Sequence, residues 1–161
     1  LLNIAYAFHL RIRSIGLPQF YFLAYQNITL KPAIHFFDML GWIFGNMKSN
    51  TLHLLTANKA SGLLQLENAN IRWYLSIDKN DLPIEATSND LSTYRSISVD
   101  GHEFEFSGGF TDLHTESYKS ILKGKGFGLE DVRNSIEIAH LIRNQAITTS
   151  KSDAHPFLSN E

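Results

Sequence analysis

His35 and Asp38 are ionisable side chains one helical turn apart at the head of a strongly apolar segment, residues 34–45. At this spacing an imidazole and a carboxylate lie on the same face of a helix. Because imidazole titrates near neutral pH, a His35 that faces a cleft could exchange a proton with a substrate hydroxyl. A histidine at the edge of a core helix more often serves as a cap or as a hydrogen-bonding group. The spacing alone therefore leaves a catalytic and a structural role open for His35.

Three further residues could bind a ligand. His114 and Thr115 open an expected helix after a Gly-Gly turn, and the free N–H groups of a helix start suit anionic or hydroxylated ligands. The guanidinium of Arg95 could pair with a carboxylate or a diphosphate. The alternatives are that Thr111 caps the helix while His114 faces solvent, and that Arg95 is a surface or cross-strand residue. With these alternatives open, we predict His114, Thr115 and Arg95 as substrate-binding residues.

Motifs for metals and cofactors are missing from the sequence. The chain has no cysteine, which excludes disulfides, thiolate nucleophiles and cysteine-ligated metals, and its histidines lack the paired spacing of a zinc site. The glycines of residues 124–128 lie between two expected helices, whereas a dinucleotide-binding glycine turn follows a strand. We interpret this segment as a helix terminator and a loop, and we predict no metal ligand and no cofactor-binding residue in the chain.

Composition limits the class of protein and its partners. With 161 residues, of which 43% are hydrophobic, the chain can bury one core. Its formal charge is -2 and its basic residues are scattered, so we expect no nucleic acid partner. The apolar runs, such as residues 20–25, are far below the ~20 residues needed to cross a bilayer, so we expect no membrane partner. The first residue is Leu and no basic stretch precedes residues 1–10 as in a signal peptide, so we expect a piece of a longer protein.

The elements that position these residues follow from periodicity and from turn residues. Pro32 starts a helix, and Asp100-Gly101 is a two-residue turn that suits a tight hairpin. The pattern predicts two strands around residues 16–18, a helix from Pro32 to the stop at Gly45-Asn46, strands over 51–55, 62–67 and 70–77, a loop over 78–92, a hairpin of residues 93–99 and 102–106, and helices over 112–123 and 129–144. The predicted fold class is α+β, with a mostly antiparallel open sheet and helices packed on one face.

Two patterns predict which faces are buried. In the strand over residues 70–77, Ile71, Trp73, Leu75 and Ile77 share an apolar face, and Arg72, Tyr74 and Ser76 share a polar face. In the last helix, Leu129, Val132, Ile136, Ala139 and Ile142 or Arg143 form the expected core face. We divide the chain into a poorly patterned segment over 1–31, an α+β domain over 32–145 and a polar tail over 146–161.

Several segments resemble one protein family in the same order along the chain. The segments are Ile34-His35-Phe36-Phe37-Asp38-Met39-Leu40-Gly41-Trp42-Ile43-Phe44-Gly45, residues 60–67, 71–77 and 93–97, Phe106-Ser107-Gly108-Gly109-Phe110-Thr111-Asp112-Leu113-His114-Thr115, residues 126–133 and 135–138, and His155-Pro156-Phe157-Leu158. Together they are similar to the C-terminal half of the glucose–fructose oxidoreductase / inositol dehydrogenase (Gfo/Idh/MocA) family. The branch they resemble oxidises the 3-hydroxyl of UDP-N-acetylglucosaminuronic acid in surface polysaccharide biosynthesis.

This resemblance implies a cytoplasmic, NAD-dependent oxidoreductase of two domains. The NAD would be bound by an N-terminal Rossmann domain that this sequence does not contain. His35 matches the catalytic histidine, the substrate would be a UDP-linked sugar acid, and the open sheet would form a homo-oligomer. The fragment alone is expected to be inactive. The alternative is a catalytically inactive fragment or a domain that serves only in sheet-mediated oligomerisation.

The chain departs from the family before His35. Relatives carry a glycine-rich run and then Asn or Asp four residues before the histidine, where this chain has Lys31, Pro32 and Ala33. Residues 1–31 show no likeness to the branch. Our hypothesis is that this segment arises from a shifted reading frame or from a fusion.

Overall fold

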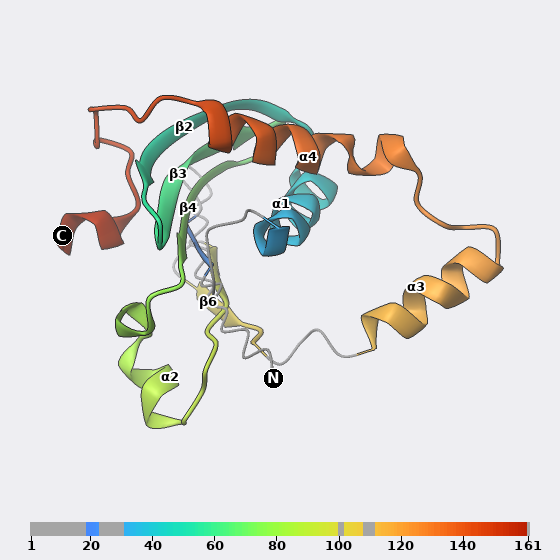
Figure 1. Cartoon of the computed structure of the whole chain (residues 1–161), viewed down its shortest axis with the longest axis horizontal. Helices are drawn as coiled ribbons and strands as arrows, with labels where there is room; N and C mark the ends of the chain where they lie inside the picture. Colours follow the sequence, from blue (N-terminus) through green and yellow to red (C-terminus); the bar gives the residue numbers. More distant parts are fainter. Residues whose placement is uncertain (1–18, 23–30, 100–101, 108–111, 161) are drawn as a thin grey trace.

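The computed structural model describes residues 19–22, 31–99, 102–107 and 112–160 (Figure 1). Its strands are β1 (Gln19–Phe22), β2 (Met47–Leu55), β3 (Lys59–Leu66), β4 (Asn70–Ser76), β5 (Ser96–Val99) and β6 (His102–Glu105). Its helices are α1 (Lys31–Phe44), η1 (Lys79–Asp81), α2 (Ile84–Ser88), α3 (Leu113–Leu122), α4 (Leu129–Asn144) and η2 (Pro156–Asn160). No helix among these residues is both long and apolar enough to cross a bilayer.

The six strands form one sheet in the order β2-β3-β4-β1-β5-β6. Every neighbouring pair is antiparallel except β1 and β4, which run parallel. Helices α1 and α4 lie side by side over one face of the sheet (Figure 1). The predicted α+β class with a mostly antiparallel sheet is thus confirmed. Strand β1 comes from the segment 1–31, and the predicted domain boundary at residue 31 stays a prediction.

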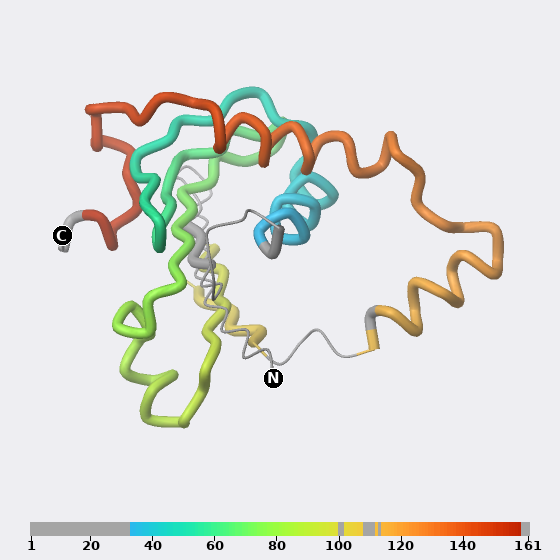
Figure 2. The backbone as a smooth tube through the Cα atoms, viewed as in Figure 1, coloured from blue at the N-terminus to red at the C-terminus, as the bar shows by residue number. Residues whose placement is uncertain are grey.

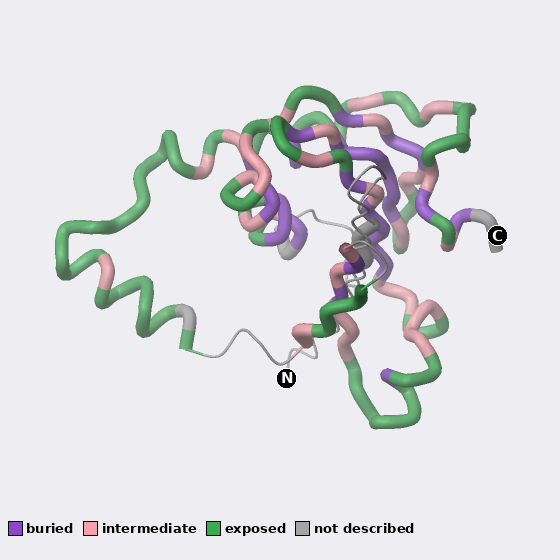
Figure 3. Tube along the Cα trace, turned by 180° about the vertical axis from the view of Figure 1, so that it is seen from behind, coloured by how far each residue is buried: buried purple, intermediate pink, exposed green. Residues whose placement is uncertain are grey.

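The main core lies between α1 and the strands β2 to β4, where the buried residues gather (Figure 3). Phe36, Phe37 and Leu40 of α1 are buried, and the Phe37 ring meets the Trp73 ring edge-on at a centroid distance of 5.6 Å. The helix ends at Gly45, as predicted. Its φ of 88° is a left-handed conformation that glycine adopts without steric cost, and its N–H donates to the Gly41 carbonyl at 2.9 Å.

The prediction of a solvent-facing polar side on β4 is wrong. Tyr74 and Ser76 are buried, because the C-terminal tail folds back over this face. The Tyr74 and Phe157 rings pack edge-on at a centroid distance of 5.5 Å. The two hydroxyl groups find a partner in Asp81, to which Tyr74 donates at 3.0 Å and Ser76 at 2.5 Å. Since each buried hydroxyl is hydrogen-bonded, burial costs little.

The tail is also fixed along the edge of β2. Asn50 and Gln145 exchange two hydrogen bonds, of 2.8 Å from the Asn50 side chain and 2.6 Å from the Gln145 side chain. The Thr148 N–H then donates to the Leu52 carbonyl at 2.8 Å. The tail predicted as polar and separate is therefore packed on the sheet.

Helix α4 has the predicted bounds, but its core face differs from the prediction. The buried residues are Ser135, Ile138, Ala139 and Ile142. Leu129 and Ile136 were expected in the core, yet they are 84% and 50% exposed. Ile136 lies at the edge of the face that these buried residues form, whereas Leu129 begins the first turns of α4, which extend past the sheet in Figure 2.

The remaining expectations have mixed outcomes. The hairpin is confirmed by the pairing of Val99 with His102, and its turn residues 100–101 lie outside the described residues. The predicted loop over 78–92 is wrong in part, since it contains η1 and α2. The predicted cap Thr111 lies outside the described residues, and Asp112 occupies the N-cap position of α3.

Candidate functional site

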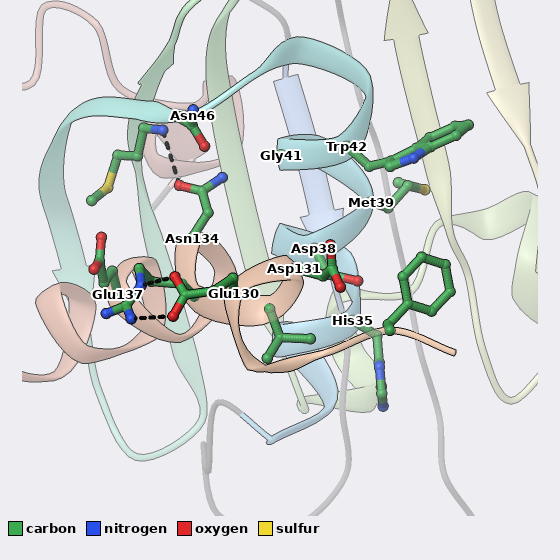
Figure 4. A pocket seen from close by; sticks show the side chains of 14 residues that line it. His35, Asp38, Met39, Gly41, Trp42, Asn46, Glu130, Asp131, Asn134 and Glu137 are labelled. Atoms are coloured by element: carbon green, nitrogen blue, oxygen red, sulfur yellow. Dashed lines mark hydrogen bonds and ion pairs between the residues drawn. The ribbon is translucent and has the colours of Figure 1, made fainter. Parts of the chain in front are cut away.

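A groove of about 790 Å³ runs between α1 and the first turns of α4 (Figure 4). The residues that line it are His35, Asp38, Met39, Gly41, Trp42, Asn46, Met47, Phe127, Glu130, Asp131, Val132, Arg133, Asn134 and Glu137. This volume falls within the range of about 300–1,000 Å³ that is typical of small-molecule sites.

Helix α1 presents the first side of the groove. Because Phe36, Phe37 and Leu40 turn into the core, the side chains at positions 35, 38 and 42 face outward. His35 and Asp38 are both exposed and line the groove, as their one-turn spacing predicts. In Figure 4 the His35 ring points away from the carboxylates of Asp38 and Asp131, so it is open to a ligand that enters beside α1.

The start of α4 supplies the second, charged side. Asp131 accepts a hydrogen bond of 2.6 Å from the Gly128 N–H, which caps the helix start. Arg133 forms a two-pronged ion pair with Glu130, with hydrogen bonds of 2.8 and 2.7 Å. The Arg133 guanidinium lowers the pKa of the Glu130 carboxyl, so Glu130 stays ionised at neutral pH.

Asn134 holds the two sides together. Its side-chain oxygen accepts a hydrogen bond of 3.0 Å from the Met47 N–H at the start of β2. Its amide group lies so near Gly41 of α1 that a Cβ at position 41 would overlap it. The missing side chain of Gly41 therefore leaves room for the Asn134 amide group between α4 and α1.

Of the four residues predicted from sequence, only His35 lines the groove. His114 and Thr115 are exposed on α3, which stands away from the sheet (Figure 1). Arg95 is half-buried before β5, and its backbone N–H donates a hydrogen bond of 2.9 Å to the Ser107 hydroxyl oxygen. Within one chain these residues do not form a cluster, and their substrate-binding roles stay predictions.

The sequence analysis missed the α4 side of the groove. Trp42 was one signal in the sequence, because a tryptophan that lies off the apolar face of a helix marks a surface that can bind a ligand or a partner. In the structure its side chain is 85% exposed. Glu130 and Asp131 were interpreted only as helix-start acids. The groove depends on how two helices pack, which their separate patterns do not report.

The described residues offer no evident place for a metal or a nucleotide cofactor. No three His, Asp or Glu side chains among them converge as metal ligands. The glycines at 124, 126 and 128 connect α3 to α4, so no strand precedes them.

Two solved structures are similar to this chain, while no protein-family model matches it. Both are of the WlbA (WbpB) dehydrogenase from Thermus thermophilus, one in complex with NAD and alpha-ketoglutarate and the other with NAD and UDP-GlcNAcA. The first has 35% identity and a TM-score of 0.75 over 97% of this chain. The second has 35% identity and a TM-score of 0.76 over 95% of it. The matches cover 53% and 52% of the dehydrogenase chains, so this chain resembles, in sequence and in fold, about half the length of an NAD-dependent dehydrogenase.

Proposed function

We propose that this chain is the substrate-binding half of an NAD-dependent oxidoreductase of the Gfo/Idh/MocA family that acts on a UDP-linked sugar acid. The observation that carries the proposal is the 35% identity to a dehydrogenase structure that holds NAD and UDP-GlcNAcA. The reaction is oxidation of the 3-hydroxyl of an N-acetylaminosugar uronic acid, for surface polysaccharide biosynthesis in the cytoplasm. NAD would be held by the half of the dehydrogenase length that this chain does not cover.

In this proposal His35 handles the hydroxyl proton. A bound NAD would supply the acceptor for the hydride of the sugar carbon, and the hydroxyl proton would have to leave to a neighbouring group. A neutral imidazole can accept that proton near pH 7. His35 suits this role because its ring is exposed at the groove on a helix that the core holds in place.

The other predicted residues would recognise the charged parts of the substrate. Arg95 would pair with the uronate or the diphosphate, because a guanidinium binds both through paired hydrogen bonds. His114 and Thr115 would bind hydroxyl or phosphate oxygens. They are on α3, which lies apart from α1 and His35 in Figure 1, so their contribution requires a further contact.

Calorimetric titration of UDP-GlcNAcA into the 161-residue chain tests the proposal. We expect wild type to bind and His35→Ala to bind about tenfold more weakly, the effect of one lost hydrogen bond to a substrate group. The matched control is His102→Ala, an exposed histidine on β6 outside the groove, which should bind like wild type. Equal affinities of wild type and His35→Ala would remove His35 from the site.

An inactive, sheet-mediated oligomerisation domain is the second candidate function. The observation that favours it is the six-stranded sheet that the described residues form, the element through which such a domain would associate. Light scattering that shows a defined oligomer, together with no binding of UDP-GlcNAcA in the calorimeter, would support this candidate over the first.

A further inference from the structure

Helix α3 carries an apolar stripe that the described part of its own chain leaves uncovered. Tyr118, Ile121 and Leu122 are 67%, 54% and 87% exposed. Their spacing places them on one face of the helix, as in helices that pack against a partner surface. Figure 1 shows α3 standing away from the sheet and from α1.

The groove between α1 and α4 has a matching apolar rim. Trp42 on one side and Phe127 on the other are 85% and 79% exposed. Large aromatic side chains at the rim of a groove are typical of protein interfaces. The groove is thus suited to the side chains of an apolar helix face as well as to a small molecule.

The groove and the α3 segment carry opposite charges. The lining contains four carboxylates, those of Asp38, Glu130, Asp131 and Glu137, and one guanidinium, that of Arg133. The guanidinium forms an ion pair with Glu130 and also interacts electrostatically with Glu137, so the lining as a whole carries an excess of negative charge.

The basic residues that follow the α3 stripe are Lys123 and Lys125. Lys119 pairs with Glu116 at 2.8 Å, whereas neither Lys123 nor Lys125 makes an ion pair within the described part of the chain. The end of α3 thus presents two uncompensated positive charges beside its apolar stripe. This complementarity favours a contact between the α3 segment and such a groove.

The turn after α3 directs the helix away from the groove of its own chain. The Ser120 hydroxyl donates to the Lys125 carbonyl at 2.9 Å, and the Lys125 N–H donates to the Ser120 carbonyl at 2.9 Å. Gly124, with a φ of 70°, completes the turn. Since α3 lies apart from α1 in Figure 1, it does not cover the groove of its own chain, and the groove is free for the α3 helix of another copy.

We propose that two copies of this chain form a dimer by exchanging α3, so that the stripe of each copy packs on the α1–α4 groove of the other. Two such contacts, related by a two-fold axis, close the assembly and leave neither groove uncovered. This interface is separate from the sheet, whose outer side at β4 is covered by the chain's own tail.

The exchange also completes the candidate site, a consequence that rests on the proposed function. His114 lies one helical turn before Tyr118 and two turns before Ile121, so the three residues share one face of α3. A helix packed by that face carries His114, and beside it Thr115, to the groove that contains His35 of the other copy. The predicted substrate residues that are apart in one chain thereby meet in the dimer.

Sedimentation velocity of the 161-residue chain over a range of concentrations, without ligand, tests the dimer. We expect Leu122→Ser to raise the dimer dissociation constant about tenfold or more, because it removes most of one buried leucine from each contact. The matched control is Ile84→Ser on α2, which is 78% exposed but far from the stripe and should leave the dissociation constant unchanged. Circular dichroism checks that both variants are folded.

A charge exchange between two variants adds a specific test. The double variant Lys123→Glu, Lys125→Glu reverses the charge at the end of the α3 segment. The variant Glu137→Lys replaces one negative charge of the groove by a positive one. Each variant alone should dimerise more weakly, and an equimolar mixture should recover dimer, since both contacts in the mixed dimer join opposite charges.

Three results would overturn the proposal: a chain that stays monomeric, a dimer insensitive to Leu122→Ser, or a mixture without recovery. Because sedimentation uses no ligand, its outcome is independent of UDP-GlcNAcA binding. A dimer that fails to bind the sugar nucleotide would refute the proposed function and leave the exchange intact.

Discussion

Phe37 holds α1 on the sheet, and its removal should be among the most damaging single changes in this chain. The side chain is fully buried, and its ring meets Trp73 edge-on at 5.6 Å and Phe36 at 5.5 Å. Truncation of a buried phenylalanine to alanine costs about 3–5 kcal/mol of unfolding free energy. An edge-to-face aromatic pair adds about 0.5–1.5 kcal/mol, so we expect Phe37→Ala to fall in the upper part of the range, about 4–5 kcal/mol.

The measurement is equilibrium unfolding in urea, followed by tryptophan fluorescence and by circular dichroism. The free energy of unfolding of a domain of this size is about 5–15 kcal/mol in total. Phe37→Ala should therefore shift the unfolding midpoint to a much lower urea concentration or leave the chain partly unfolded. The control is Ile43→Ala in the same helix. Ile43 is about half exposed, and alanine has the better helix propensity, so this change should cost less than about 1 kcal/mol.

The prediction is wrong if Phe37→Ala lowers the free energy of unfolding by less than about 2 kcal/mol, or if Phe37→Ala and Ile43→Ala lower it by similar amounts. Either result would mean that α1 is held by something other than its buried aromatic face. The orientation of His35 would then need another explanation, because His35 faces the groove only while Phe37 faces the core.

Three further changes test other parts of the fold, each by urea unfolding. Burial lowers the pKa of His53 below its usual value of 6.5, so as the pH falls the unfolded chain binds a proton on this residue more readily than the folded chain does. The free energy of unfolding should therefore be constant above about pH 7 and decrease as the pH drops below 6.5. In His53→Gln this decrease should be smaller. Gly62→Ala should cost about 1–3 kcal/mol, since the new Cβ would lie 2.7 Å from Trp73 Cζ2 and overlap the Thr51 carbonyl oxygen. Phe157→Ala should cost about 1–2 kcal/mol by loosening the tail from the sheet, and an unchanged midpoint would show that the tail adds no stability.

Local signals in the sequence were sufficient for the elements that depend on a few neighbouring residues. The glycine at position 45 ends α1 where predicted, and the Asp100-Gly101 pair lies between two strands that do form a hairpin. Helix α4 begins at Leu129 and ends at Asn144, as its periodicity predicts. In each case the physical cause, a dihedral preference or a repeat, acts over fewer than about five residues.

Contacts between distant segments could not be predicted in the same way. The alternation in β4 correctly separates Trp73 from Tyr74, yet it contains no information that Phe157 will cover the second face. The parallel placement of β1 beside β4 likewise depends on the whole sheet. For the site, the pattern brought out His35, while the groove beside it is formed by the packing of α4 against α1, two segments about 90 residues apart in the sequence.

The wrong prediction for α4 has a physical meaning of its own. Leu129 and Ile136 were assigned to the core because they have the same helical spacing as Ala139 and Ile142. In the structure Ala139 and Ile142 are buried, whereas Leu129 and Ile136 are exposed. An apolar face that runs past the available partner surface indicates a contact beyond one copy, since exposed apolar side chains at regular helical spacing bring no stability to a monomer. The stripe on α3 has the same property, and it joins α4 through Phe127 at the rim of the groove. Two neighbouring helices thus have uncovered apolar faces, and Phe127, in the segment that joins them, lies at the groove that contains His35.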